Sequence, residues 1–318
     1  MRIHYQIRNN SIEIIRCFGT DPLVLLPEKI AGYPVRRIAA YAFSEKKETE
    51  EEDVFLYETD GGGIFEEGSR LLAGTEVETV ILPDTLKEIG NYIFYGCRNL
   101  KKLEFSDTLT QIGRGAFTGC GKLRYLKVHL KQGETSCVKE ILGELWQRID
   151  VTFYRPEQTV KLVFPEHYEE AVENTPARIL FTQHHGTGNN YRQCFYDRKM
   201  DYRKYDELFP LALAQDRTDV LIDLVFRRLG YPYELTETHE CIYEQYVREH
   251  LSEITPYLVE QESLNRLSRI SERGLWTEQG LESTIQVAAE KGKKEILGFL
   301  MNEKHSLFPA KKRKRFLL

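Results

Sequence analysis

The chain has 318 residues, of which 41% are hydrophobic and 29% are charged, and its formal net charge is −5. This length suits about two domains of a globular protein. The negative charge argues against general nucleic-acid binding, which needs a basic surface. The one basic run, KKRKR at 311–315, is interpreted as a solvated C-terminal tail, and contact with nucleic acid or anionic lipid is the alternative.

No secretory or membrane segment is visible. The N-terminus lacks the apolar stretch of a secretory signal, and no run approaches the ~18 apolar residues of a membrane helix. We therefore expect a cytoplasmic protein without a membrane span. A cell-surface adhesin exported by another route is the alternative. The six cysteines form no CxxC pair, so free thiols are expected, with no metal site and no cofactor.

A repeat of 23 residues organises the N-terminal half. Residues 77–100 and 100–123 match at a constant offset, in the range of leucine-rich repeats. The matching positions include Val80 with Leu103, Leu86 with Leu109, Ile89 with Ile112, Phe94 with Phe117, and Cys97 with Cys120. Alternating apolar residues predict short strands, the phenylalanines fill the space between coils, and the cysteines pack in tight turns. A single coil buries little, so stacking has to make the core.

This pattern, as in LPDTLKEIGNYIFYGCRNL, resembles the BspA-type leucine-rich repeat family of bacteria and some protists. A looser copy is LPEKIAGYPVRRIAAYAF at 26–43, and the resemblance extends over about residues 10–155. It implies a short solenoid of stacked strands and says little about function. Family members with an export signal are cell-surface proteins associated with adhesion or host contact.

An acidic insertion near 44–70 interrupts the array. Ile38 and Ile89 lie 51 residues apart, whereas two periods would give 46. We interpret this segment as an eroded repeat with a surface loop, and a partner-binding acidic loop is the alternative. Beyond the clear copies, residues 123–130 continue with the next strand. A helix-like stretch then precedes a last strand at 149–156.

From about residue 160 the pattern has the period of a helix. Residues 202–235 predict two helices joined by a polar turn, 236–273 predict two or three more, and 281–305 repeat the first design. The last segment is similar to the paired helices of ankyrin repeats, although the Thr-Pro-Leu-His turn signature is missing. The expected fold class is α+β, with a leucine-rich repeat array at 1–155 and an all-helical ankyrin-like domain at 156–318.

The stretch QHHGTGNNYRQC at 183–194 has the residue types of an active site. A nucleophilic site would use His184, His185, Arg192 and Cys194. The spacing fits no phosphate-binding loop, and glycines and asparagines are typical of tight connections. We interpret the stretch as a structural loop between domains; a ligand contact and catalysis are the alternatives.

The repeat sheet provides the candidate binding surface. Residues that alternate with the core positions should point outward and form a row suited to contact with a protein. We predict partner contacts at Ile81, Lys102, Glu104, Tyr125, Lys127 and His129. The sequence thus indicates a non-enzymatic scaffold or recognition module with a protein partner, no nucleic acid and no metal. It leaves the partner's identity and the oligomeric state open.

Overall fold

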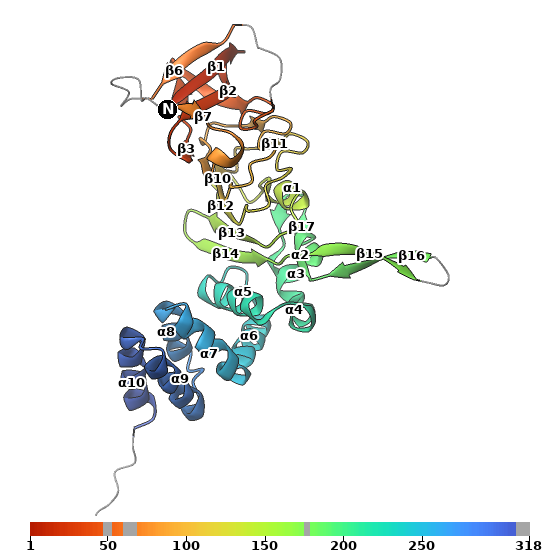
Figure 1. The fold of residues 1–318 in the computed structure, drawn as a ribbon. Coiled ribbons are helices and arrows are strands. Elements are labelled where there is room, and N and C mark those ends of the chain that lie inside the picture. Colours follow the sequence, from red (N-terminus) through yellow and green to blue (C-terminus); the bar gives the residue numbers. More distant parts are fainter. Residues whose placement is uncertain (47–52, 60–68, 175–178, 310–318) are drawn as a thin grey trace, which may run out of the picture. The chain divides into compact units, whose positions relative to one another are not determined.

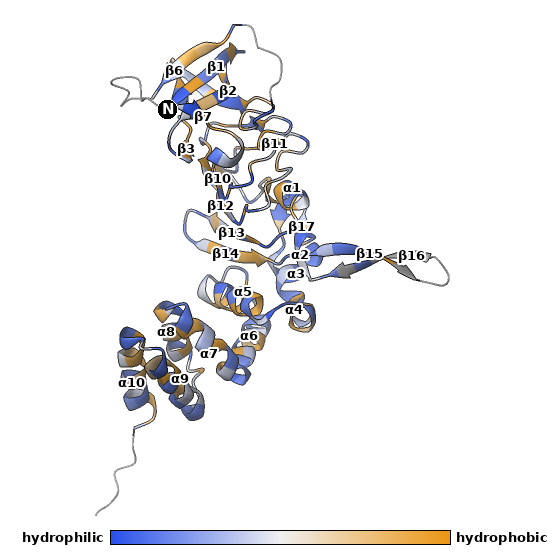
Figure 2. Ribbon diagram, in the orientation of Figure 1, coloured by the Kyte–Doolittle hydropathy of each residue, from blue (hydrophilic) through white to orange (hydrophobic). Residues whose placement is uncertain are grey.

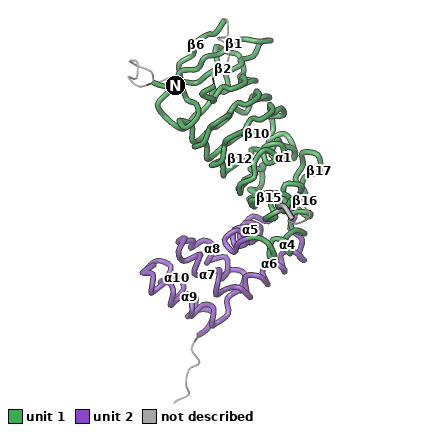
Figure 3. The backbone as a smooth tube through the Cα atoms, turned by 45° about the vertical axis from the view of Figure 1, so that its right-hand side comes forward, with its two compact units in different colours: residues 1–216 green, residues 217–318 purple. Residues whose placement is uncertain are grey.

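The computed structural model describes residues 1–46, 53–59, 69–174 and 179–309 (Figure 1). Much of the acidic insertion and the KKRKR run lie outside these residues. The chain forms two compact units, residues 1–216 and residues 217–318, coloured separately in Figure 3. The division falls at 216/217, whereas the repeat pattern places a domain boundary at 155/156.

The first unit begins with a sheet that covers the start of the array. Strands β1 and β2 form an antiparallel hairpin whose turn residues, Asn9 and Asn10, have positive φ. Strand β6 pairs with β1, β7 pairs with β2, and β2 runs parallel to β5. The bounds are β1 Arg2–Arg8, β2 Ser11–Gly19, β4 Lys29–Ile30, β5 Tyr33–Ile38, β6 Phe55–Glu58 and β7 Arg70–Leu71.

The array itself is a solenoid with two parallel strand ladders. One ladder continues from β5 through β9 to β11, and the other runs from β3 through β8, β10 and β12 to β13. Antiparallel β14 pairs with β13 and ends the second ladder. The bounds are β3 Leu23–Leu25, β8 Thr79–Ile81, β9 Glu88–Ile89, β10 Lys102–Ser106, β11 Gln111–Ile112, β12 Tyr125–His129, β13 Ile149–Tyr154 and β14 Thr159–Phe164. A 3-10 turn, Gly74–Glu76, precedes β8.

The repeat positions form the core that the sequence predicts. The inward residues of the second ladder are fully or almost fully buried: Val80, Leu103, Phe105, Leu126 and Val128. The rings of Phe43, Phe94 and Phe117 stack from coil to coil, with centroids 5.3 and 5.5 Å apart. The thiols of Cys97 and Cys120 donate hydrogen bonds to carbonyls of the preceding coil. The interpretation of these cysteines as packing residues is therefore confirmed.

The insertion lies between two coils that are direct neighbours in the array. Ile38 pairs directly with Ile89 although they are 51 residues apart, and Phe43 stacks on Phe94. The two coils are therefore neighbours, so the interpretation as an eroded repeat was wrong. The described parts of the insertion add β6 and β7 to the N-terminal sheet instead.

Further strands and short helices follow the array. The prediction of a helical region from about residue 160 therefore set its start too early in the chain. The hydroxyl of Tyr205 donates to the Val163 carbonyl (2.6 Å) and accepts from its N–H (3.0 Å), which ties α3 to β14. These packed elements extend the first unit to residue 216. The bounds are α1 Val138–Gly143, β15 Tyr168–Asn174, β16 Ile179–His185, α2 Gly188–Arg192, β17 Phe195–Tyr196, β18 Lys199–Met200, α3 Tyr202–Glu207 and α4 Phe209–Gln215.

The described part of the second unit is helical, as predicted. Its helices carry hydrophobic and hydrophilic residues together (Figure 2), which suits helices that each bury one face. Between α9 and α7, Thr284 donates a buried hydrogen bond to Thr255 at 2.8 Å. A turn with Gly292 at positive φ joins α9 and α10. The bounds are α5 Thr218–Gly230, α6 Glu237–Glu249, α7 Leu251–Glu260, α8 Leu264–Glu272, α9 Glu278–Glu290 and α10 Lys294–Leu307.

Candidate partner-binding surface

The six predicted contact residues lie on one face of the second ladder. We call the outward side of strands β3, β8, β10, β12, β13 and β14 the sheet face. The parallel register aligns outward residues in rows across neighbouring strands. One row runs Thr79, Lys102, Tyr125, Asp150, and the next runs Ile81, Glu104, Lys127, Thr152. His129 lies in the row beside Tyr154. Short strands at the repeat period place these side chains on one surface.

Glu104 is the centre of charge on the sheet face. Its carboxylate lies 2.9 Å from Nε2 of His129, 3.1 Å from Nζ of Lys102 and 3.7 Å from Nζ of Lys127. Partial burial raises the pKa of this carboxyl, but hydrogen bonds from His129 and Lys102 and the charge of Lys127 outweigh burial and lower the pKa overall. Glu104 is therefore ionised at neutral pH and orders the cations around it.

Tyrosine rings lie beside this cluster. The His129 ring stacks on Tyr154 with centroids 4.9 Å apart, and Nζ of Lys127 lies 5.9 Å from the centre of the same ring. Tyr125 is 48% exposed. The sequence prediction omitted Tyr154, although its alternation with Val151 and Phe153 in the last predicted strand could have placed it outward. Exposed tyrosines suit protein contacts because they offer apolar area and a polar tip.

An apolar edge completes the sheet face. Leu23 and Leu25 of β3 are 47% and 60% exposed and align with Thr79 and Ile81. Where these strands end, a hollow of about 170 Å³ is lined by Leu25 and Ile81, by His129 and Lys131, and by the carboxylates of Glu28, Asp84 and Glu104. The sequence prediction missed both leucines because β3 and β8 are separated in the chain by the insertion.

The described side chains of the 183–194 stretch do not converge on a site. His184 and His185 end β16, and the side chain of His184 lies outside the described part of the structure. Arg192 ends α2 and is buried, and Cys194 is buried just after it. The catalytic alternative needs these groups around one accessible space, and the described ones are not arranged in that way.

Arg192 holds the end of the array together. Its guanidinium donates hydrogen bonds of 2.6–3.2 Å to five backbone carbonyls: those of Leu142, Leu145, Gln147, Pro165 and Gly188. Burial lowers the pKa of Arg192 to about 10. Close packing also requires the glycines nearby, because a Cβ on Gly188 would lie 2.2 Å from the Pro165 oxygen. The arginine therefore serves packing.

Cys194 lacks the features of a nucleophile. Burial raises the pKa of its thiol to about 12, and its Sγ lies 3.7 Å from the Asn190 carbonyl oxygen. Reactive cysteines have a lowered pKa and an accessible sulfur. The thiol of Cys194 has neither, which counts against the catalytic alternative.

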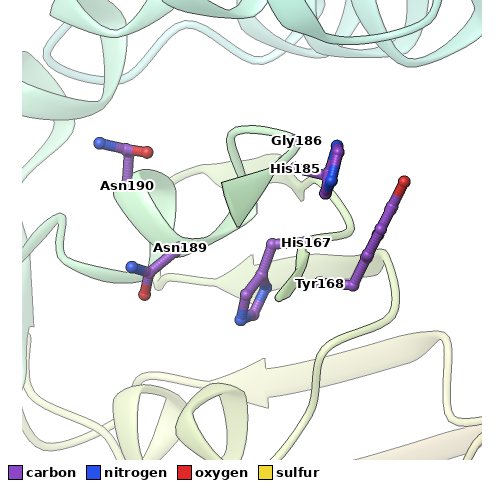
Figure 4. Close-up of a pocket in the computed structure, with 6 residues that line it drawn as sticks. All are labelled: His167, Tyr168, His185, Gly186, Asn189 and Asn190. Carbon is purple, nitrogen blue, oxygen red and sulfur yellow. The ribbon is translucent and has the colours of Figure 1, made fainter. Parts of the chain in front are cut away.

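A small hollow beside this stretch has a volume of about 230 Å³ (Figure 4). Its lining residues are His167, Tyr168, His185, Gly186, Asn189 and Asn190. The rings of Tyr168 and His185 stack at 4.5 Å, and Nε2 of His185 lies 3.2 Å from Glu170. Neither Cys194 nor Arg192 is in the lining. Within the described ranges, no group of three or more His, Cys, Asp or Glu side chains could hold a metal ion.

Among the helices that the structure describes, none combines the length and the apolar character that crossing a bilayer requires.

The stacked coils and their two parallel ladders define a leucine-rich repeat solenoid within the first unit. Residues 66–141 match the family described as "BspA type Leucine rich repeat region (6 copies)", so the array carries BspA-type repeats, as the motifs predicted. The matched segment is shorter than the solenoid, which begins before the insertion. No protein among the curated ones matches the chain.

Three solved structures are similar to parts of the chain. A leucine-rich cell surface protein of Faecalibacterium prausnitzii is 18% identical over 49% of this chain and 41% of its own, with a TM-score of 0.29. The leucine-rich repeat protein of T. pallidum is 19% identical over 39% of this chain and 67% of its own, with a TM-score of 0.21. A leucine-rich repeat protein of Bacteroides ovatus is 16% identical over 42% of this chain and 49% of its own, with a TM-score of 0.20. The chain thus spans less than half of the Faecalibacterium protein.

Proposed function

We propose that this chain is a non-enzymatic recognition module that binds a protein partner through the sheet face. The observation that carries the proposal is the alignment of the six predicted residues in neighbouring rows, with exposed leucines at one edge and tyrosines among the charges. Interfaces that bind proteins combine apolar and aromatic anchors with a polar surround. Repeat arrays present such surfaces because each coil adds one strand to the same face.

The hollow on the sheet face supports protein recognition at that face over binding of a small molecule. Its volume of about 170 Å³, like the 230 Å³ of the hollow beside α2, is below the ~300 Å³ at which ligand pockets begin, whereas a hollow of about 350 Å³ lies along β5, β9 and β11 of the other ladder. An open face of this kind suits a partner that covers many side chains at once.

We place this role in the cytoplasm. All six cysteines are thiols, which is the state favoured by a reducing compartment. Cell fractionation with an antibody against the chain is expected to recover it with the cytosol. Recovery from the cell surface would contradict this part of the proposal and favour an adhesin.

The experiment that tests the proposal is affinity capture with the full chain as bait. Wild type is compared with the triple variant Tyr125→Ala, Lys127→Ala, His129→Ala. A matched control, Tyr95→Ala, Arg98→Ala, Lys122→Ala, removes one tyrosine and two cations from the turns of the array, away from the sheet face. Circular dichroism checks that all three proteins are folded.

We expect a protein that wild type and the control variant capture and the triple variant loses. Direct titration of that purified protein should show at least a tenfold weaker Kd for the triple variant. Equal capture by all three baits would exclude the sheet face and direct attention to the helices of the second unit.

A further inference from the structure

We infer that the sheet face takes an acidic segment of a protein partner, one that places a large apolar side chain next to its carboxylates. This inference rests on the proposed function, since it specifies the chemistry of the partner that the face would bind. Two features carry it: the local charge and the position of the apolar hollow.

The sheet face is positively charged although the chain as a whole carries −5. Lys102, Lys127 and Lys161 point outward from β10, β12 and β14, and Glu104 is the one accessible carboxylate among the outward residues of these strands and β13. Asp150 of β13 is buried. It lies 2.9 Å from Arg148 and 3.3 Å from Arg124, so two guanidinium groups accompany its one negative charge. Cations thus outnumber carboxylates on a protein whose overall charge is negative, and an acidic partner is complementary to them.

The apolar part of the face adjoins both cations and carboxylates. The lining of the hollow between Leu25 and Ile81 includes His129 and Lys131 and also Glu28, Asp84 and Glu104, and Asp84 pairs with Lys131. A leucine or aromatic side chain seated there would bury the exposed leucine of β3. Acidic residues next to it in sequence would pair with Lys127 and Lys102 rather than with Lys131, which Asp84 already neutralises, so apolar and acidic residues are adjacent in the partner segment.

A single-stranded nucleic acid would also match cations and tyrosine rings. One observation favours the protein segment. Leu23 and Leu25 are exposed at the edge of the sheet face, and apolar side chains of this kind offer nothing to a charged backbone. Binding of a nucleic acid is therefore one of the outcomes that the test distinguishes.

The test selects short random peptides displayed on phage against the immobilised full chain. Enriched peptides are synthesised, and their Kd is measured by fluorescence polarisation. We expect enriched peptides to combine Asp or Glu with a large apolar residue and to bind more weakly as salt rises, because the ion pairs formed are exposed. The Tyr125/Lys127/His129 triple variant should bind them about tenfold more weakly.

Single variants test the charge and the hollow separately. Glu104→Gln removes the central carboxylate at nearly constant volume and should tighten binding of an acidic peptide about threefold or more. Lys127→Glu should weaken it about tenfold, and Leu25→Ser should weaken it by a similar factor. Lys122→Glu, a charge reversal in a turn outside the face, is the control and should leave the Kd nearly unchanged.

The outcomes separate the inference from the proposed function. Peptides that need the sheet face but lack acidic residues, or that bind Glu104→Gln no better than wild type, would overturn the acidic-segment inference and leave the recognition role standing. Enriched peptides that all bind the triple variant as well as wild type would overturn both. Tighter binding of a fluorescent single-stranded oligonucleotide than of any peptide, lost in the triple variant, would assign the face to nucleic acid instead.

Discussion

Arg192 illustrates how a residue that suggests chemistry can serve packing. The chain must end the repeat array, and the backbone carbonyls left around α1 and β14 need donors once they are buried. A guanidinium offers five N–H groups in a fixed plane, which is why one arginine can satisfy five carbonyls from three separate segments. Lysine has the charge but lacks this geometry.

Replacing Arg192 by leucine should destabilise the first unit by on the order of 3 kcal/mol, because five buried carbonyls would lose charged donors. Arg192→Lys should recover only part of that loss. Urea unfolding followed by circular dichroism measures the change, with exposed Arg114→Ala as the control. An unchanged midpoint for Arg192→Leu would show that the carbonyls find other donors at no cost.

The cysteines make a second prediction at the scale of single residues. Burial raises the pKa of the thiols of Cys17, Cys97, Cys137 and Cys194 to about 12, and raises that of Cys120 as well. Cys241 is exposed. A thiol reagent at pH 8 should therefore label Cys241 alone in the folded protein, and all six cysteines in denaturant. Fast labelling of Cys194 in the Cys241→Ser variant would revive the catalytic alternative.

Within the array, glycines set the distance between coils. Gly90 and Gly113 occupy equivalent positions, and the Gly113 N–H donates to the Ile89 carbonyl at 2.8 Å. A Cβ on Gly113 would lie 2.2 Å from the carbonyl carbon of Gly90. No side chain fits there unless the two coils separate, which would disturb both strand ladders.

The substitution Gly113→Ala should therefore cost more than about 2 kcal/mol of the free energy of unfolding, which is large for a single methyl group. Gly121→Ala is the matched control. A Cβ on Gly121 meets nothing within 4 Å, so the change should stay within about 0.5 kcal/mol. Chemical unfolding of both variants gives the comparison, and equal stability would mean that the coils adjust freely.

Elements that repeat at 23 residues could be predicted from the sequence, because the spacing of Leu86, Phe94 and Cys97 recurs in the next coil. The six contact residues followed from the same spacing through strand alternation. The pairing of β3 with β8 and of β5 with β9 could not be predicted, because the insertion hides how many coils separate them. Strand β14 was missed because VKLVF at 160–164 is a short apolar run that fits a helix as well as a strand.

On the scale of the whole molecule, total charge is a poor guide to local function. The chain has 49 acidic and 44 basic side chains, and this balance argued against a basic binding surface. The parallel register nevertheless places Lys102 and Lys127 on one face of the array, and antiparallel β14 adds Lys161, while Glu104 is the accessible carboxylate of these strands. For a repeat protein, the charge of each surface row is therefore a better guide to binding than the net charge of the whole chain.

The extent of the first unit can be tested by comparing two truncated chains, residues 1–155 and residues 1–216. The shorter chain lacks β14, whose Val160, Leu162 and Phe164 are fully buried, and it lacks Arg192 with its five carbonyl contacts. It also leaves the edge of β13 unpaired, which favours aggregation. We expect its Tm to lie on the order of 10 °C below that of the longer chain, corresponding to a loss of several kcal/mol. Differential scanning fluorimetry measures both values, and size-exclusion chromatography detects aggregates of the shorter chain. Equal Tm values would place the end of the folded repeat domain at residue 155, where the repeat pattern itself ends.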